Sequence, residues 1–270
     1  MESPLTACGA IFEIKSARYA SKNPGTALVG CEGWSISHDT TACFSENGSH
    51  LQRYSSRFGA VEINSSFYRS HRPSTYARWA ASVPDEFRFC VKLPRLISHQ
   101  LRLSGIEQAL ATFFGEVGAL GEKLGCILVQ LPPSGMYIAS VAHNFFTLMR
   151  QNFSCMVACE ARHPSWFGSD ATAMLEAHAI TRVQADPPVG PTQDFVPTTK
   201  SRYMRLHGSP KVYYSPYSEA YLAGLVDELS REAHPAWLIF DNTASGAAIQ
   251  NALTVRLGGA SPWGLPQPST

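Results

Sequence analysis

The sequence predicts a single (β/α)8 barrel, an α/β fold of the TIM type with parallel strands. Apolar or alternating runs that suit strands recur along the chain, and amphipathic runs that suit helices separate them. About eight such units follow one another at roughly 30 residues each, which is the size of a βαβ unit. The run Cys126–Leu131 is nearly all apolar and stops at a Pro-Pro pair, which is typical of a parallel strand covered by helices on both faces.

Each strand is predicted from its local pattern. The first, over 27–30, opens into a Gly-x-x-Gly turn. The second, over 60–64, alternates apolar Val61 and Ile63 with polar Glu62 and Asn64. Polar side chains aimed at a covered interior must be paired or functional, because burying them unpaired is unfavourable. The remaining strands are predicted at 87–92, 126–131, 155–160, 182–186, 203–207 and 237–242.

Helices fill the intervals between these strands. Ser49 suits the N-cap of a helix over 51–58, and Pro73 opens a helix that ends before Pro84. Further helical patterns cover 106–124, 141–149, 170–178, 219–231 and 247–257. The barrel is expected to occupy 27–260, after an extension over 1–26 and before a tail over 261–270. The loop over 187–197 is expected at the substrate mouth, because long loops in compact domains are commonly functional.

The composition argues against several classes of protein. The formal net charge is +1, so the chain lacks the basic field that dominates sequence-independent nucleic-acid binding. No apolar run approaches the roughly 18 residues of a membrane span. The N-terminus lacks the apolar region of a secretory signal, and the cysteines, an odd number, lie largely where small hydrophobes would. We therefore expect a cytoplasmic protein with reduced thiols, and the sequence does not predict an oligomeric state.

Polar residues gather at the predicted carboxyl ends of the strands, where the active site of such a barrel is built. Tyr203, Arg205 and His207 share one face of a strand, as do Glu160 and Arg162, and both faces are expected to point into the barrel mouth. The predicted catalytic residues are Glu62, Glu160 and His207. The predicted substrate contacts are Asn64, Tyr68, Lys92, Gln130, Arg162, His163, Asp186, Arg205, Asp241 and Asn242.

Glu62 and Glu160 are of the residue type that forms an acid/base pair, in which different environments leave one carboxyl protonated and the other ionised. The alternative is that each carboxylate is the structural ion-pair partner of Arg205 or Arg162. These two guanidinium groups and Lys92 suit a phosphate or carboxylate of a substrate. We expect Glu62 and Glu160 to be partly solvated, so that replacing either by Gln changes stability by less than about 1 kcal/mol.

The sequence also contains residue types suited to a metal site and to a serine nucleophile. The residues whose types suit a divalent metal are His99, His163, His207, Asp186 and Asp241. Because neighbouring arginines would repel a cation, no cofactor is predicted, and a divalent metal stays the alternative. Ser65 and Ser66 lack a Gly-x-Ser-x-Gly elbow, so serine nucleophile chemistry is not predicted.

Five motifs occur in order along the chain. They are VEINSSFY at 61–68, QLPP at 130–133, EARHPSW at 160–166, RLHG at 205–208 with Tyr213 and Tyr217, and FDNT at 240–243 with NA at 251–252. Together they resemble the signature motifs of the YecE-like family, domain of unknown function 72, over about 28–257. The resemblance implies a TIM barrel and brings no established activity. Cys31-Glu32 replaces a small hydroxyl pair usual in that family, and 38–47 replaces an aromatic-Pro segment, so loss of the family's function stays open.

These observations favour an enzyme that hydrolyses or isomerises a small anionic, sugar-like or nucleotide-like substrate by acid/base chemistry. One alternative is a nucleic-acid-binding or endonuclease-like barrel that holds a flipped or single-stranded base. Another is a barrel that binds without catalysis. Polyanion binding should weaken steeply with ionic strength, whereas binding of one phosphate is much less sensitive.

Overall fold

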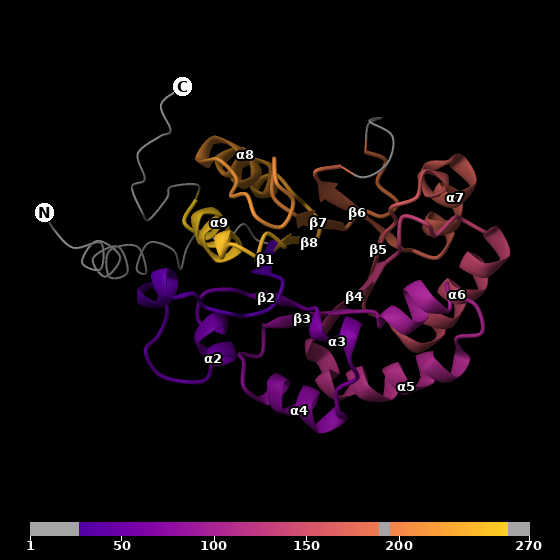
Figure 1. Cartoon of the computed structure of the whole chain (residues 1–270), viewed down its shortest axis with the longest axis horizontal. Coiled ribbons are helices and arrows are strands. Elements are labelled where there is room, and N and C mark those ends of the chain that lie inside the picture. Colours follow the sequence, from indigo (N-terminus) through magenta and orange to yellow (C-terminus); the bar gives the residue numbers. More distant parts are fainter. Residues whose placement is uncertain (1–26, 189–194, 259–270) are drawn as a thin grey trace, which may run out of the picture.

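The computed structural model describes residues 27–188 and 195–258. Its eight strands are all parallel and follow one another around a nearly closed barrel, with β1 beside β8 (Figure 1). The strands are β1 Ala27–Cys31, β2 Ala60–Ile63, β3 Arg88–Lys92, β4 Leu124–Gln130, β5 Met156–Glu160, β6 Thr181–Asp186, β7 Arg202–Leu206 and β8 Ala236–Phe240. The predicted (β/α)8 barrel is confirmed, and each predicted strand end lies within two residues of the observed one.

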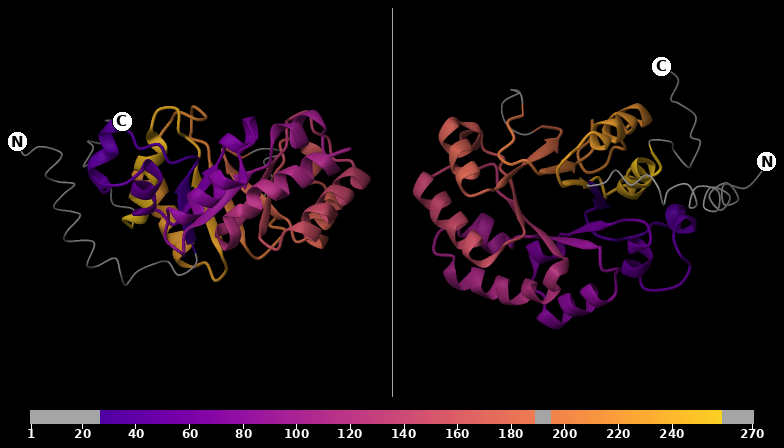
Figure 2. Two further views of the ribbon diagram at one scale, coloured as in Figure 1. Left: turned by 90° about the horizontal axis from the view of Figure 1, so that it is seen from below. Right: turned by 180° about the vertical axis from the view of Figure 1, so that it is seen from behind.

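Helices form the outer layer, outside the strands in every view (Figures 1 and 2). They are α2 His50–Ser55, α3 Ser65–Tyr68, α4 Pro73–Ala81, α5 Glu107–Val117, α6 Ala139–Asn152, α7 Ser169–Ala177, α8 Glu219–Ser230 and α9 Ala247–Arg256. Short helical turns cover η1 His38–Cys43, η2 Leu96–Gln100, η3 Gly118–Lys123 and η4 Pro164–Phe167. The single helix predicted over 106–124 is observed as α5 followed directly by η3, and inside η3 Gly121 adopts a φ of 57° that interrupts the helical path.

The barrel closes between β1 and β2 through a tyrosine hydroxyl. Tyr54 OH accepts a hydrogen bond from the Cys31 N–H at 2.7 Å and donates one to the Ala60 carbonyl at 2.9 Å. Beyond it the two strands meet directly, where the Gly33 N–H donates to the Glu62 carbonyl. Gly30 permits the close approach, since a Cβ at this position would lie 2.0 Å from the Ala60 oxygen.

The alternation of side chains along the strands produces two apolar cores. Inward-facing side chains fill the barrel, where the rings of Tyr203 and Trp237 stack with centroids 5.8 Å apart. Outward-facing side chains such as Val61 and Leu238 pack in the shell beneath the helices. Toward the carboxyl end of β7, the residue that follows Tyr203 on the inward face is Arg205, so the apolar interior gives way to charged groups at the mouth.

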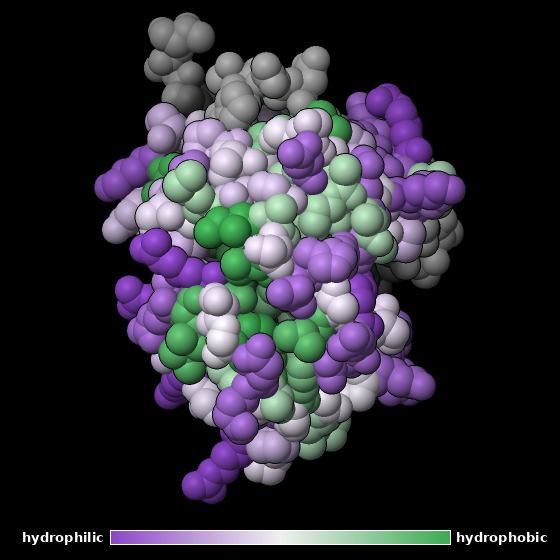
Figure 3. Space-filling view, turned by 90° about the vertical axis from the view of Figure 1, so that its right-hand side faces the viewer, coloured by the Kyte–Doolittle hydropathy of each residue, from purple (hydrophilic) through white to green (hydrophobic). Residues whose placement is uncertain are grey.

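The outer surface facing the viewer in Figure 3 is mostly polar, with apolar side chains gathered near its middle. None of the helices within 27–188 and 195–258 is both long and apolar enough to cross a membrane. Among the described cysteines, five are free thiols, namely Cys31, Cys90, Cys126, Cys155 and Cys159. Cys43 is disulfide-bonded, which departs from the expectation of reduced thiols. The predicted extension 1–26, the whole predicted tail 261–270 with residues 259–260 before it, and residues 189–194 of the predicted mouth loop lie outside the described residues.

Candidate active site

Arg205 lies at the centre of the barrel mouth, and its guanidinium contacts three carboxylates. Its Nε and Nη2 donate to Glu62 at 3.1 and 2.7 Å, and its Nη1 donates to Glu160 at 2.5 Å. Its Nη2 also lies 3.1 Å from Oδ2 of Asp241. Tyr203 OH donates to Glu62 at 2.8 Å. The arginine comes from β7, and the carboxylates come from β2, β5 and the residue that follows β8, so four parts of the chain meet at this point.

The whole group is removed from solvent. Arg205 and Glu62 are 0% exposed, and Glu160 and Asp241 are 2% exposed. The expectation that Glu62 and Glu160 are partly solvated is therefore wrong, because the barrel wall and Arg205 enclose both carboxylates. The expectation that Arg205 is available to a substrate anion is also wrong for this structure, since its Nε, Nη1 and Nη2 all face protein carboxylates.

Further polar side chains surround Glu160 and Asp241. His207 places Nδ1 2.7 Å from Asp241 Oδ2 and Nε2 3.2 Å from Glu160 Oε1, so both ring nitrogens face carboxylates. Arg162 donates to Glu160 at 2.8 Å from Nη2, and the Gln130 amide donates to it at 3.3 Å. The sequence prediction that these side chains converge on the mouth holds, and they do so as one ion-pair network.

The network holds Glu160 and Arg205 in their charged forms. Burial alone would raise the pKa of Glu160, but the charges of Arg205 and Arg162 and the hydrogen bond to His207 outweigh it and hold that pKa well below its ordinary value. Burial likewise opposes the charged form of Arg205, yet Glu62 and Glu160 keep its pKa well above the ordinary value. Because both groups stay ionised, this arrangement suits structure and electrostatics better than proton exchange by Glu160.

Lys92 and Asn64 lie beside this network at the ends of β3 and β2. Lys92 is 6% exposed, and its Nζ lies 4.5 Å from the centroid of the Phe67 ring. Burial lowers the pKa of Lys92, and the charge of Arg205 lowers it further against the opposing effect of nearby carboxylates. Oδ1 of Asn64 is buried without a hydrogen-bond partner, as is Oδ1 of Asp241. Such acceptors are suited to a donor supplied by water or by a ligand.

Four predicted substrate contacts lie apart from the network. Tyr68 is 71% exposed on α3 and lines a cavity that residues of η2 and α5 also line. His163 caps η4 by accepting from the Ser165 N–H. Asp186 accepts hydrogen bonds from two tyrosine hydroxyls, and the Asn242 amide ties the loop before α8 to α9. The hydrogen bonds of His163, Asp186 and Asn242 support the framework, and none of the four residues contacts Arg205.

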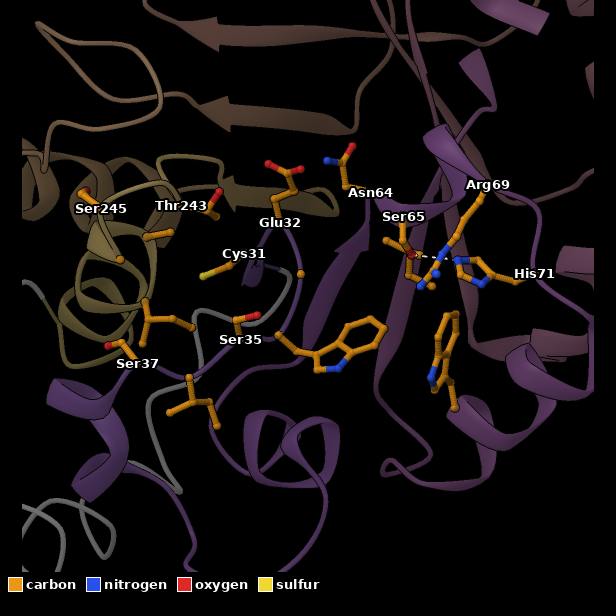
Figure 4. A pocket seen from close by; sticks show the side chains of 18 residues that line it. Cys31, Glu32, Ser35, Ser37, Asn64, Ser65, Arg69, His71, Thr243 and Ser245 are labelled. Atoms are coloured by element: carbon orange, nitrogen blue, oxygen red, sulfur yellow. Dashed lines mark hydrogen bonds between the residues drawn. The ribbon is translucent and has the colours of Figure 1, made fainter. Parts of the chain in front are cut away.

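A cavity of about 740 Å³ opens beside the network, over the carboxyl ends of β1, β2 and β8 (Figure 4). Glu32 lines it and is half-buried. Burial, followed by the negative charge of Glu62, raises the pKa of Glu32 to about 6, although Arg205, Lys92 and Asn64 oppose the rise. Glu32 can therefore hold or release a proton near neutral pH, which the enclosed Glu160 cannot.

Several lining residues are absent from the site predicted from the sequence. Trp34 and Trp79 form one wall, with ring centroids 5.1 Å apart. Arg69 and His71 lie on another wall and come from the loop between α3 and α4. Glu32 follows a strand directly and is one of the polar residues noted at strand ends, although it was not included in the predicted site. Arg69 and His71 do not come directly after a strand, so only the path of the chain brings them to the mouth.

The network contains residue types that bind metals, but their side chains are not arranged as metal ligands. Within 27–188 and 195–258, no three His, Cys, Asp or Glu side chains are grouped so that they could hold a metal ion. The oxygens that would serve as ligands in the network point at the Arg205 guanidinium instead.

Comparisons with known proteins agree with the fold and its motifs. The family described as "Protein of unknown function DUF72" matches residues 28–260. The UPF0759 protein YecE of Escherichia coli K12 is 31% identical over 118 residues, and this match spans 43% of the chain and 43% of YecE. The UPF0759 protein YunF of Bacillus subtilis 168 is 22% identical over 83% of the chain and 91% of YunF.

Two solved structures of DUF72 family proteins share the fold. One from Thermotoga maritima has a TM-score of 0.70 and 26% identity, covering 86% of this chain and 98% of that one. One from Enterococcus faecalis V583 has a TM-score of 0.70 and 21% identity, covering 90% and 97%. The match to the family over nearly the whole barrel, together with the shared fold, shows that this chain belongs to the DUF72 (UPF0759) family.

Proposed function

We propose that this protein is an enzyme that hydrolyses or isomerises a small anionic, polyhydroxylated substrate by acid/base chemistry in the cavity beside the Arg205 network. The observation that carries the proposal is Glu32, a carboxyl that titrates near pH 6 on the wall of a cavity at the carboxyl ends of barrel strands. A catalytic acid or base works best when its pKa lies near the working pH. Glu32 therefore takes the proton-transfer role that the sequence had suggested for Glu62 or Glu160.

The network supports this role electrostatically. The negative charge of Glu62 beside Glu32 favours the protonated form of Glu32, and Arg205 holds Glu62 in place. Two carboxyls whose environments set different protonation states are a recurrent arrangement in acid/base enzymes. Glu62, Glu160 and His207 thus act as positioning residues in this proposal, and Glu32 is the group that meets the substrate.

The remaining lining residues indicate the class of substrate. Arg69 brings a guanidinium to the cavity, which suits a phosphate or carboxylate. Trp34 and Trp79 offer aromatic surface to a sugar ring or base, and Ser35, Ser37 and Thr243 offer hydroxyls to polar groups. Hydroxyls with aromatic rings and one cation match a sugar phosphate better than a long polyanion, which needs many phosphate contacts.

The first test measures melting temperature with inorganic phosphate, glucose and glucose 6-phosphate. Selective binding to the folded state should raise it, most with glucose 6-phosphate. Arg69→Met should abolish the shift, whereas Arg78→Met, on the exposed side of α4, should leave it unchanged. A shift with single-stranded DNA that falls steeply with salt would favour the nucleic-acid alternative instead.

The second test follows turnover. The wild-type protein and Glu32→Gln are incubated with a mixture of cellular metabolites, and mass spectrometry identifies compounds that change. Glu32→Gln should slow conversion by about 100-fold or more, the usual effect of removing an acid/base group. Equal conversion by both proteins would remove Glu32 from the mechanism.

A further inference from the structure

Ser65 and His71 form a hydrogen-bonded pair on the wall of the same cavity. Ser65 Oγ lies 2.8 Å from His71 Nε2, and both side chains line the cavity. Figure 4 shows this bond on the side where Arg69 also reaches in, apart from Glu32. A nucleophile and a base within hydrogen-bond reach, beside a space that can hold a substrate, are the first requirement for covalent catalysis.

The local fold holds the pair in place. Ser65 is the first residue of α3 and follows β2 at the barrel mouth, after Asn64. The His71 ring packs edge-on against Tyr76 and Trp79, with centroids 5.8 and 5.2 Å away. The base is therefore fixed by aromatic packing from α4, while its Nε2 faces the serine.

The charges around His71 also suit a base. Burial and the nearby charge of Arg69 lower the pKa of His71, and the carboxylate of Glu116 partly opposes this. The imidazole is therefore neutral at pH 7, so that it can accept the proton of a serine hydroxyl. Arg69 lines the same wall and offers a cation to the oxyanion that forms when a carbonyl is attacked.

We propose that Ser65 is a nucleophile, His71 its general base and Arg69 the oxyanion-stabilising cation, in the hydrolysis of an ester of a small carboxylic acid. Ser65 Oγ attacks the carbonyl carbon while its proton moves to His71 Nε2. The ester C–O bond then breaks, and the leaving alkoxide takes that proton, which leaves an acyl-Ser65. Water attacks the acyl carbon, gives a proton to His71, and releases the acid as Ser65 recovers its proton.

This inference rests on the proposed function only in using the same cavity, and it adds hydrolysis of a carboxylic ester through Ser65, a reaction that does not use Glu32. It was not expected from the sequence, because the Gly-x-Ser-x-Gly elbow is missing. Here the chain turn between α3 and α4 brings the histidine back to the serine, over a separation of six residues.

Covalent labelling with a fluorophosphonate tests the inference without a known substrate. The serine oxygen displaces fluoride from phosphorus, so intact-mass measurement should show one phosphonyl group, and peptide mapping should place it on Ser65. Ser65→Ala should not be labelled. His71→Gln should be labelled at least about 100-fold more slowly than the wild type, the usual effect of removing a general base. Ser74→Ala is the control, because Ser74 is an exposed serine of α4 outside the cavity and its replacement should leave labelling at the wild-type rate.

Two further readouts separate catalysis from a structural hydrogen bond. The labelling rate should rise with pH, and the midpoint of this rise should lie below pH 6.5, the ordinary pKa of histidine, since the pKa of His71 is lowered. The labelling reaction uses the Ser65 oxygen and His71 and needs no proton from Glu32, so a failure of the Glu32 proposal in the conversion assay leaves this one standing. Absence of labelling in wild-type protein whose melting curve is intact would overturn the inference, as would equal labelling of Ser65→Ala.

Discussion

Replacing Glu62 by Gln tests whether the Arg205 network holds the barrel mouth together. The carboxylate of Glu62 accepts from Arg205 Nε at 3.1 Å, from Arg205 Nη2 at 2.7 Å and from Tyr203 OH at 2.8 Å. A glutamine of the same shape removes the negative charge and turns an NH2 group toward one of these donors. Because Glu62 and Arg205 are both 0% exposed, water cannot replace the lost partner.

The expected loss of stability is about 3 to 5 kcal/mol, the usual effect of breaking a buried ion pair by removing one partner. This loss replaces the stability change of less than about 1 kcal/mol that was predicted from the sequence. That prediction assumed that Glu62 is partly solvated, whereas Glu62 is buried. Glu228→Gln is the matched control: Glu228 is also 2.7 Å from an arginine, Arg202, but its side chain is 44% exposed. Exposed pairs contribute about 0 to 1 kcal/mol.

Urea unfolding of both variants is the assay, followed by tryptophan fluorescence and by circular dichroism so that coincident curves establish two-state behaviour. With a slope of about 3 kcal/mol per M, Glu62→Gln should lower the midpoint by roughly 1 M or more. The reasoning would be refuted by a Glu62→Gln midpoint as close to wild type as that of Glu228→Gln, with the slope unchanged.

Three further predictions concern the neighbouring strands. Glu32→Gln should stabilise the protein above pH 6 by up to about 2 kcal/mol, because the folded state holds the Glu32 proton to a higher pH than the unfolded chain does. That gain should disappear as pH falls from about 6 to about 4.5 in thermal unfolding, and a gain constant across this range would contradict the raised pKa. Tyr54→Phe should destabilise by about 1 to 3 kcal/mol in urea, since it leaves the buried Cys31 N–H and Ala60 carbonyl unpaired, and a loss under about 0.5 kcal/mol would disprove the bridge. Gly30→Ala should lose more than about 3 kcal/mol or fail to fold, because its Cβ meets the Ala60 oxygen at 2.0 Å; circular dichroism identical to wild type with an unchanged midpoint would contradict this.

The sequence by itself determined the fold and the edge of the barrel at which its polar residues gather. A pattern such as the apolar run of β4 depends only on which faces of the strand are covered by helices. It can therefore be recognised in the residues of the strand itself. Because parallel strands of a barrel share one carboxyl edge, the polar residues in the last positions of β2, β5 and β7 had to meet there, as Glu62, Glu160 and Arg205 do.

Only the tertiary structure decided what those residues do. Whether a carboxylate is solvated or enclosed depends on neighbours from distant strands, and Arg205 converts Glu62 and Glu160 from candidate acids and bases into ion-pair partners. The same geometry leaves Glu32 beside the cavity with a raised pKa. It also returns His71 to Ser65 through a turn in the chain, a contact that depends on loop path and ring packing and that no strand or helix period encodes.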